Sequence, residues 1–364
     1  MSTSSDRWQQ ARNILAIRLD YLGDVLMTTP ALRALRNRAG GRITLLTSPG
    51  GAAVAPCIPE IDDTIVYAAP WLKHSEAPDA ARDLAMIETL RARRFDAAVI
   101  FTVYSQNPLP AALLCHLAGI PLRLAHCREN PYQLLSDWVA ETEPQQQVRH
   151  EVRRQLDLVA TVGARCEDER LSFCVPDTAQ EAVRAHLARL HVRKRFIVLH
   201  PGASAASRRY PAASFRRAAE LLSRNFRHPL VFTGSTAEAP LIDEIRAGLP
   251  DAHSLAGRLS LAELGALLRE AALVVTNNTG PAHLAAAIGT PVVDLYALTN
   301  PQHTPWQVPA RVLFQDVSCR YCYRSACPMG HQACLASVAP ERVLEAAAEL
   351  LGGARDSRPA LPPL

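Results

Sequence analysis

Three features of this chain could do chemistry: an aspartate at an expected strand end, two polar loops and a group of cysteines. Asp24 follows the apolar run 13–17 and stands directly after Gly23, which would let the backbone bend tightly. Open α/β sheets bind their ligands at the carboxyl ends of the strands. Asp24 could therefore act on a substrate there, or it could cap the helix expected at 25–38.

The first polar loop lies in the segment LVVTNNTGPAHLAAAIGTPVVDLYA at 273–297. A buried strand is expected to end at Asn277, and Pro281 suits the first turn of a helix because its missing N–H would be unpaired there. The residues at the helix N-terminus, where N–H groups and the helix dipole favour phosphate, are Asn278, Thr279 and Gly280. His283 either points at the same anion or packs as a buried histidine.

The second polar loop is LHPGASAASRRYP at 199–211, after another expected strand. Gly202 would permit an unusual turn. Side chains that could hold a diphosphate are Ser204, Ser207, Arg208 and Arg209. A solvated basic loop is the alternative interpretation. The chain contains neither a P-loop nor a dinucleotide-binding signature.

Four of the nine cysteines lie close together in the sequence, at Cys319, Cys322, Cys327 and Cys334. A C-x-x-C pair followed by two more thiols is metal-ligand spacing, and four thiolates suit tetrahedral zinc or iron. The spacing matches no common zinc-finger pattern. A structural metal ion and a set of reduced or disulfide-capable thiols both remain interpretations.

Short β-branched runs alternate with helical periodicity along the whole chain, which predicts βα units and parallel sheets. A length of 364 residues exceeds what one core usually supports. We therefore expect an α/β fold of two Rossmann-like domains that face each other across a cleft. The predicted domains are 1–175 and 176–352, and the proline-rich end 353–364 is expected to be disordered.

The composition, with 48% hydrophobic and 20% charged residues, is that of an ordinary soluble globular protein. A net charge of +4 is too small to indicate a nucleic-acid partner. The chain begins with no apolar core of signal-peptide length, and no apolar run is as long as a membrane span. These observations predict a cytoplasmic protein.

Three motifs, in this order and at these separations, resemble glycosyltransferase family 9, the ADP-heptose:lipopolysaccharide heptosyltransferases. They are RLDYLGDVLMTTPALRAL at 18–35, HPGASAASRRYP at 200–211 and NNTGPAHLAAAIGTP at 277–291. The resemblance runs from about residue 13 to residue 350. It implies a GT-B architecture, with the acceptor on the N-terminal domain and the nucleotide sugar on the C-terminal one. It also implies inversion at the anomeric carbon and no metal at the reaction centre.

The resemblance also assigns roles to single residues of this chain. Asp24 matches the catalytic aspartate, with Asp20 as a weaker, more structural candidate. Glu238 matches a residue that holds the ribose, and Leu259 one that lines the adenine pocket. The other implied donor-site residues are Ser204, Arg208, Asn278, Thr279, Gly280 and His283. Asn278 replaces a common aspartate and Arg208 a lysine. We expect the Asn278 amide to donate a hydrogen bond to the donor, and the alternative is that Asn278 only shapes the turn before the helix.

The predicted function is transfer of heptose from ADP-heptose to a hydroxyl of the lipopolysaccharide inner core. The acceptor would be an acidic glycolipid, Kdo–lipid A or a heptosyl inner core, met at the cytoplasmic face of the inner membrane. Candidate acceptor contacts are Gly23, Arg123 and Arg128. The alternatives are an enzyme of the same fold that uses a protein acceptor or another nucleotide sugar, and a non-catalytic nucleotide-sugar-binding protein.

Overall fold

The computed structural model describes residues 4–72, 77 and 79–353. Contacts divide the chain into two units, Met1–Ser172 and Phe173–Leu364, so the division falls three residues before the expected domain boundary at 175. Of the tail expected to be disordered, all but Gly353 lies outside the described residues. The two units are the N-terminal and C-terminal units below.

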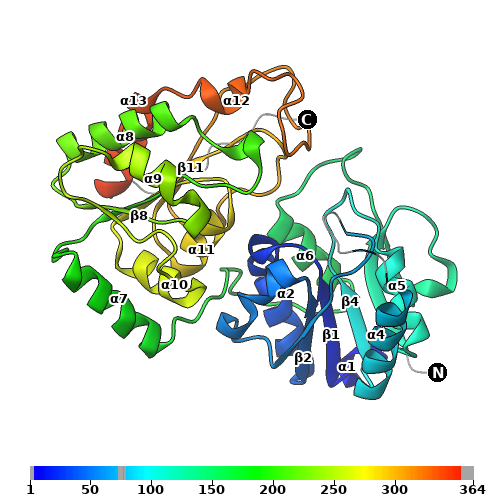
Figure 1. Cartoon of the computed structure of the whole chain (residues 1–364). Helices are drawn as coiled ribbons and strands as arrows, with labels where there is room; N and C mark the ends of the chain where they lie inside the picture. The colour runs from blue at the N-terminus through cyan, green and yellow to red at the C-terminus, as the bar shows by residue number, and fades with distance from the viewer. Residues whose placement is uncertain (1–3, 73–76, 78, 354–364) are drawn as a thin grey trace. The chain divides into compact units, whose positions relative to one another are not determined.

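The N-terminal unit is built on a sheet of six parallel strands in the order β3-β2-β1-β4-β5-β6 (Figure 1). The strands are β1 (Asn13–Arg18), β2 (Arg42–Thr47), β3 (Asp63–Val66), β4 (Ala97–Ile100), β5 (Leu122–Cys127) and β6 (Asp137–Ala140). The central strands are almost continuously apolar, as is typical of parallel strands covered on both faces.

Helices cover both faces of this sheet: α2 (Leu22–Ala39) packs with α6 (Glu151–Ala160), and α4 (Ala80–Arg93) contacts α5 (Leu109–Leu117). Leu15 and Ile17 of β1 belong to the apolar core under α4 and α5. The remaining helices of four or more residues described here are α1 (Ser4–Gln10) and α3 (Pro49–Ala52).

The C-terminal unit repeats the plan with a second parallel sheet, in the order β12-β11-β10-β7-β8-β9. Its strands are β7 (Ile197–His200), β8 (Leu230–Phe232), β9 (Ala252–Ser254), β10 (Leu273–Asn277), β11 (Val292–Leu295) and β12 (Ala310–Leu313). Its helices are α7 (Asp177–Arg189), α8 (Ala212–Asn225), α9 (Ala239–Arg246), α10 (Leu261–Glu270), α11 (Gly280–Ile288), α12 (Ala333–Ala336) and α13 (Pro340–Leu351).

Each sheet has a central pair of strands from which the chain winds outward in both directions, β1 with β4 and β7 with β10. Such a topological switch point leaves a crevice at the carboxyl ends of the two strands, where α/β proteins bind ligands. The predicted α/β fold of two Rossmann-like domains is confirmed. The fold also predicts where in each unit the site lies.

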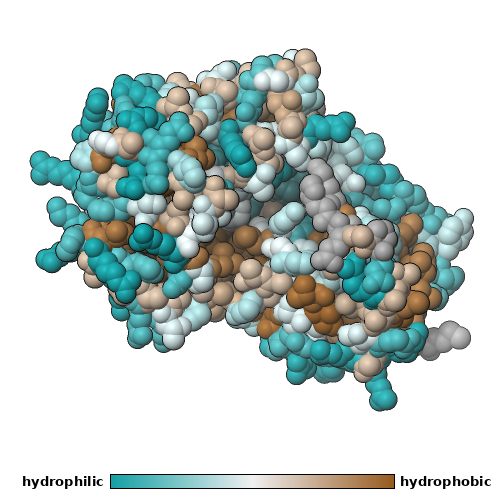
Figure 2. All heavy atoms as spheres, in the orientation of Figure 1, coloured by the Kyte–Doolittle hydropathy of each residue, from teal (hydrophilic) through white to brown (hydrophobic). Residues whose placement is uncertain are grey.

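One boundary differs from expectation, because α2 begins at Leu22 rather than at residue 25. Gly23 therefore lies in the first turn of a helix and not in a tight bend. Among the described residues, no helix is both long and apolar enough to cross a bilayer. On the face drawn in Figure 2, hydrophilic residues predominate and hydrophobic ones form separate patches.

Candidate active site

Asp24 is the third residue of α2, after the N-cap residue Tyr21. Its main-chain N–H donates to Tyr21 O at 3.0 Å, and no side chain caps this helix. Asp24 is therefore not the N-cap residue that one interpretation of the sequence suggested. Its carboxylate lies in the first turn, where the helix dipole favours a negative charge.

Arg18, the last residue of β1, holds this carboxylate. Its guanidinium pairs with three carboxylates: Nη2 with Asp24 Oδ1 at 3.1 Å, Nε with Asp20 Oδ2 at 2.9 Å and Nη1 with Glu151 Oε1 at 2.8 Å. Arg18 and Glu151 have no exposed side-chain surface, whereas 20% of the Asp24 side chain is exposed. Burial alone would lower the pKa of Arg18, but the carboxylates outweigh it and raise that pKa above its ordinary value.

Asp20 lies on the other side of the same guanidinium. Its Oδ1 accepts a hydrogen bond of 2.6 Å from Gln106 Nε2. Burial raises the pKa of Asp20 to about 6, although the charge of Arg18 lowers it. Burial thus favours the protonated form of Asp20 more than that of an exposed aspartate.

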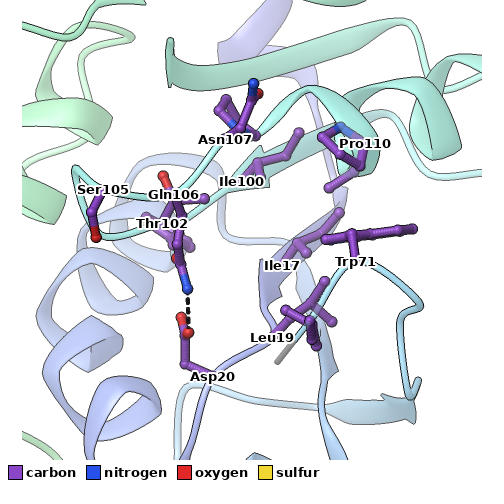
Figure 3. A pocket seen from close by; sticks show the side chains of 14 residues that line it. Ile17, Leu19, Asp20, Trp71, Ile100, Thr102, Ser105, Gln106, Asn107 and Pro110 are labelled. Carbon is purple, nitrogen blue, oxygen red and sulfur yellow. Dashed lines mark hydrogen bonds between the residues drawn. The ribbon is translucent and has the colours of Figure 1, made fainter. Parts of the chain in front are cut away.

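A cavity of about 350 Å³ opens beside Asp20, at the switch point between β1 and β4 (Figure 3). The polar residues on one side of it include Asp20, Ser105 and Gln106. The apolar residues on the other side include Ile17, Leu19, Trp71 and Pro110. Among the described residues that line this cavity, none is lysine, arginine or histidine. The described walls of the cavity thus combine polar side chains on one side with apolar side chains on the other.

The two arginines expected at the acceptor site do not line this cavity. Arg123 donates to main-chain carbonyl groups on both sides of its strand, those of Ile120, Pro121, Gln133 and Leu134. Arg128 Nη2 donates to the carbonyls of Tyr104 at 3.2 Å and Glu143 at 2.7 Å. Both side chains thus hydrogen-bond to main-chain carbonyl groups of their own unit. The geometry gives no support for the acceptor role that was expected for them. Gly23 adjoins Asp24 in the first turn of α2.

In the C-terminal unit, the polar loops after β7 and β10 meet at the other switch point, and Asn277 joins them. Its Nδ2 donates to Pro201 O at 2.7 Å and Gly202 O at 3.3 Å, and its Oδ1 accepts from Tyr210 N at 3.0 Å. Asn277 is completely buried. The two loops that sequence analysis assigned to the diphosphate are therefore held as one structure.

The helix start expected at Pro281 is confirmed. α11 begins at Gly280, with Pro281 in its first turn and Thr279 as the N-cap residue, and it ends at Ile288, with Gly289 (φ 85°) as the C-cap residue. Thr279 Oγ1 donates to Asn277 O at 3.2 Å, and its side chain does not cap the helix. His283 is buried, with its ring centroid 6.5 Å from that of His303, as the packing interpretation expects.

Asn278 differs from expectation, because its amide donates within the chain. Nδ2 donates to Asp294 Oδ2 at 3.0 Å and to His303 O at 2.8 Å, and the residue is almost fully buried. This geometry argues against the predicted hydrogen bond from Nδ2 to the donor. Burial raises the pKa of Asp294 to about 7, although the Asn278 amide and the charge of Arg208 lower it.

Glu238 lies against the loop after β7. Its Oε2 accepts from Ser235 N at 2.7 Å and from Ser235 Oγ at 2.9 Å. A Cβ atom added to Gly202 would lie 1.9 Å from Glu238 Oε1. Gly202 thus leaves room for the Glu238 carboxylate, and its backbone does not have the left-handed conformation that an unusual turn would need. Ser204 is exposed on the same loop, Arg208 is half-buried, and Leu259 is half-buried just before α10.

Comparison with known proteins shows the family of this chain. The family model described as glycosyltransferase family 9 (heptosyltransferase) matches residues 84–333. The chain belongs to this family. It is 25% identical over 294 residues to lipopolysaccharide heptosyltransferase 3 of Escherichia coli, which covers 79% of this chain and 83% of the relative.

Two solved structures have the same fold as this family 9 glycosyltransferase. One is a family 9 glycosyltransferase from Veillonella parvula, with TM-score 0.77 and 20% identity over 96% of this chain and 99% of that one. The other is the E. coli ADP-heptose lipopolysaccharide heptosyltransferase II, with TM-score 0.73 and 24% identity over 93% and 98%. The fold class predicted from sequence, GT-B, is that of these two glycosyltransferases.

The four clustered cysteines of this family 9 enzyme line a single cavity of about 20 Å³, with His331 and Gln332 beside them. All nine cysteines are free thiols. Burial tends to raise the pKa of Cys327, but main-chain N–H groups at 329–332 hydrogen-bond to it and lower its pKa below the ordinary value. As the side chains stand, no group of three or more His, Cys, Asp or Glu residues in the described part of the chain is arranged to hold a metal ion.

Sequence analysis missed three residues of the family 9 site: Arg18, Asn277 and Asp294. A signal was available for two of them. Arg18 and Asp294 are charged residues within runs that otherwise predict buried strands, and a buried charge requires a partner. The partners themselves, such as Glu151, lie too far along the sequence to be identified from it.

Proposed function

We propose that this family 9 enzyme transfers heptose from ADP-heptose to a hydroxyl group of the lipopolysaccharide inner core, with inversion at the anomeric carbon. The observation that carries the proposal is the ion pair between Arg18 and Asp24, at the switch point of the N-terminal unit. It provides a partly exposed carboxylate of defined orientation, which is what a general base requires. The relatives named above are called lipopolysaccharide heptosyltransferases, which supports the choice of donor and acceptor.

In the proposed reaction, the acceptor hydroxyl attacks the anomeric carbon of heptose while the bond to the ADP oxygen breaks. Asp24 accepts the hydroxyl proton, and a positioned base of this kind contributes about 10²–10⁴-fold in rate. Arg18 binds Asp24 Oδ1 and so limits the orientations of the carboxylate. Arg18 is a positioning residue in this scheme.

The leaving diphosphate gains negative charge as the bond breaks. The N-terminus of α11, at Thr279 and Gly280, and the guanidinium of Arg208 would stabilise that charge without a metal ion. Glu238 Oε1 would accept hydrogen bonds from the ribose hydroxyls, and Leu259 would line the adenine pocket. Ser204 supplies a hydroxyl on the exposed side of the loop.

The cavity beside Asp20 would hold part of the acceptor. A sugar ring suits its described lining, because polar side chains on one side could bind hydroxyl groups and the apolar side could pack against the ring. The acidic groups of a Kdo–lipid A or heptosyl acceptor would then lie outside this cavity. Contact with the cytoplasmic face of the inner membrane is part of the proposal, because such an acceptor is a lipid.

The experiment is a transfer assay with purified protein, ADP-heptose, and Kdo–lipid A or a heptosylated inner core as acceptor. The product should carry a heptose whose anomeric configuration is opposite to that of the donor, as determined by NMR. Retention of configuration would overturn the inverting mechanism. Transfer from a different nucleotide sugar, or to a protein but not to either glycolipid, would overturn the substrate assignment. ADP binding without any transfer would favour a binding protein.

A further inference from the structure

The cysteine loop, residues 319–334, gathers four thiols around a cavity of about 20 Å³. A space of 10–15 Å³ on this measure accommodates one water-sized guest. The thiols are Cys319, Cys322, Cys327 and Cys334. Cysteines up to 15 positions apart therefore surround a space for one small ion or molecule, and they are four of the ten residues that line it.

The backbone of this loop is strained on both sides of Cys322 and two residues before Cys334. Tyr321, Tyr323 and Gln332 have φ values of 59°, 54° and 47°, in the left-handed region that non-glycine residues rarely adopt. Tyr321 and Tyr323 flank Cys322 directly. Gln332 N donates to Cys327 Sγ at 3.4 Å. Strain of this kind persists where the surroundings require it, and it is concentrated at functional sites.

His331 faces the same cavity, and its hydrogen bonds indicate its tautomer. Nδ1 accepts from Ala333 N at 2.9 Å, so in the neutral ring the proton is on Nε2. Nε2 lies 3.9 Å from Cys319 Sγ. A protonated nitrogen cannot bind a metal, whereas it can donate to a sulfur ligand. His331 therefore supports Cys319 rather than adding a fifth ligand.

We propose that the four cysteine thiolates bind one zinc or iron ion in this cavity, as a structural site separate from the reacting groups. Four thiolates are the ligand set that both metals accept in tetrahedral geometry. Each thiol releases its proton to solvent when its sulfur binds the ion. Because no three of these groups are arranged around one point at present, binding requires the thiols to turn toward the centre of the cavity.

This site would support the loop that carries Arg208. Gln332 Nε2 donates to the carbonyls of Ala206 at 3.0 Å, Ser207 at 2.9 Å and Arg209 at 2.9 Å. Ser207 in turn donates to the cysteine loop, from N to Ser325 O at 3.0 Å and from Oγ to Arg324 O at 2.8 Å. The ion would thus position Arg208 for the diphosphate, an effect that rests on the proposed function.

The first measurement is the metal content of protein purified without a histidine tag. Wild type should contain about one zinc or iron ion per chain, and Cys322→Ser should lose most of it. Cys174→Ser, an exposed thiol outside the loop, and His331→Gln should both keep it. Cobalt added to metal-depleted wild type should produce a sulfur-to-cobalt charge-transfer band. Absence of metal, of the cobalt band and of any difference between the variants would overturn the site.

The second measurement is ADP affinity by calorimetry, with wild type before and after removal of the ion by a chelator. This comparison does not depend on the folding of a variant. Removal of the ion should weaken ADP binding at least tenfold, and added zinc should restore it. An unchanged affinity for ADP would overturn the proposal that the ion positions Arg208. The existence of the metal site would then still be tested by the metal content. Neither the metal content nor the ADP affinity depends on heptose transfer, so a failure of transfer would leave both results valid.

Discussion

The guanidinium of Arg18 and the carboxylate of Asp24 form an ion pair of 3.1 Å between a wholly buried side chain and a partly exposed one. The cation is anchored by Glu151 on its far side at 2.8 Å. Because Arg18 is fixed by Glu151, its guanidinium would lose contact with the Asp24 carboxylate if the Asp24 side chain rotated. The orientation of Asp24 is therefore set by the core of the N-terminal unit.

Asp24→Asn should lower the turnover of heptose transfer about 10²–10⁴-fold, because an amide cannot accept the hydroxyl proton. Binding of ADP, measured by calorimetry, should stay at the wild-type level. Asp20→Asn is the comparison variant, since Asp20 pairs with the same arginine at 2.9 Å. Because Asp20 also lines the proposed acceptor cavity, this variant should weaken acceptor binding but lower turnover less than Asp24→Asn. If Asp20→Asn abolished transfer while Asp24→Asn retained it, the roles of the two aspartates would be exchanged.

Arg18→Met should destabilise the protein by about 3–5 kcal/mol in chemical denaturation, because Glu151 loses its buried countercharge. This loss of stability should be smaller at low pH, because a protonated Glu151 carries no charge that needs a partner. Arg91→Met, which removes an exposed ion pair with Glu88, should change stability by less than about 1 kcal/mol. Equal effects of the two substitutions would contradict the structural role of Arg18.

Arg208→Ala should weaken ADP binding and slow transfer, with a loss on the order of 3 kcal/mol in transition-state stabilisation. Arg208→Lys should recover part of this loss, because the positive charge remains while the planar donor group does not. Arg209→Ala is the control from the same loop, since Arg209 Nε already donates to Ala203 O at 2.7 Å. Wild-type affinity and turnover in Arg208→Ala would exclude the proposed contact.

Asp294→Asn should make stability less dependent on pH. The pKa of Asp294 is raised by burial to about 7 from 3.8, so the folded state holds a proton that the unfolded state releases between these values. Wild-type stability should therefore fall as pH rises from about 4 to 7, by up to a few kcal/mol from this group. Denaturation of both proteins from pH 4 to 8 measures the difference. Parallel curves would mean that Asp294 does not titrate in this range.

Local patterns of the sequence indicated many elements of both units, although they did not reveal the strands β5, β6 and β12. Strands covered on both faces produce short apolar runs, and the helix period distinguishes the segments that connect these strands. Pro281 and Gly289 marked the two ends of α11 because their backbone preferences are properties of single residues. The same patterns placed Asp24, Arg208 and Thr279 near strand ends. The family resemblance predicted the GT-B fold and the enzyme class.

The tertiary structure decided which side chains meet. Arg18 and Glu151 are 133 positions apart, and they become partners because residues near the ends of distant elements come together at one edge of the sheet. The Asn278 amide donates a hydrogen bond to Asp294 on the neighbouring strand. This bond argues against the expected hydrogen bond from the same amide to the nucleotide sugar. Arg123 and Arg128 donate hydrogen bonds to main-chain carbonyl groups, and the distribution of charged residues in the sequence does not predict these bonds. Hydrogen bonds and ion pairs depend on distance in space, so strand order and loop path determine them, and a local sequence pattern contains neither.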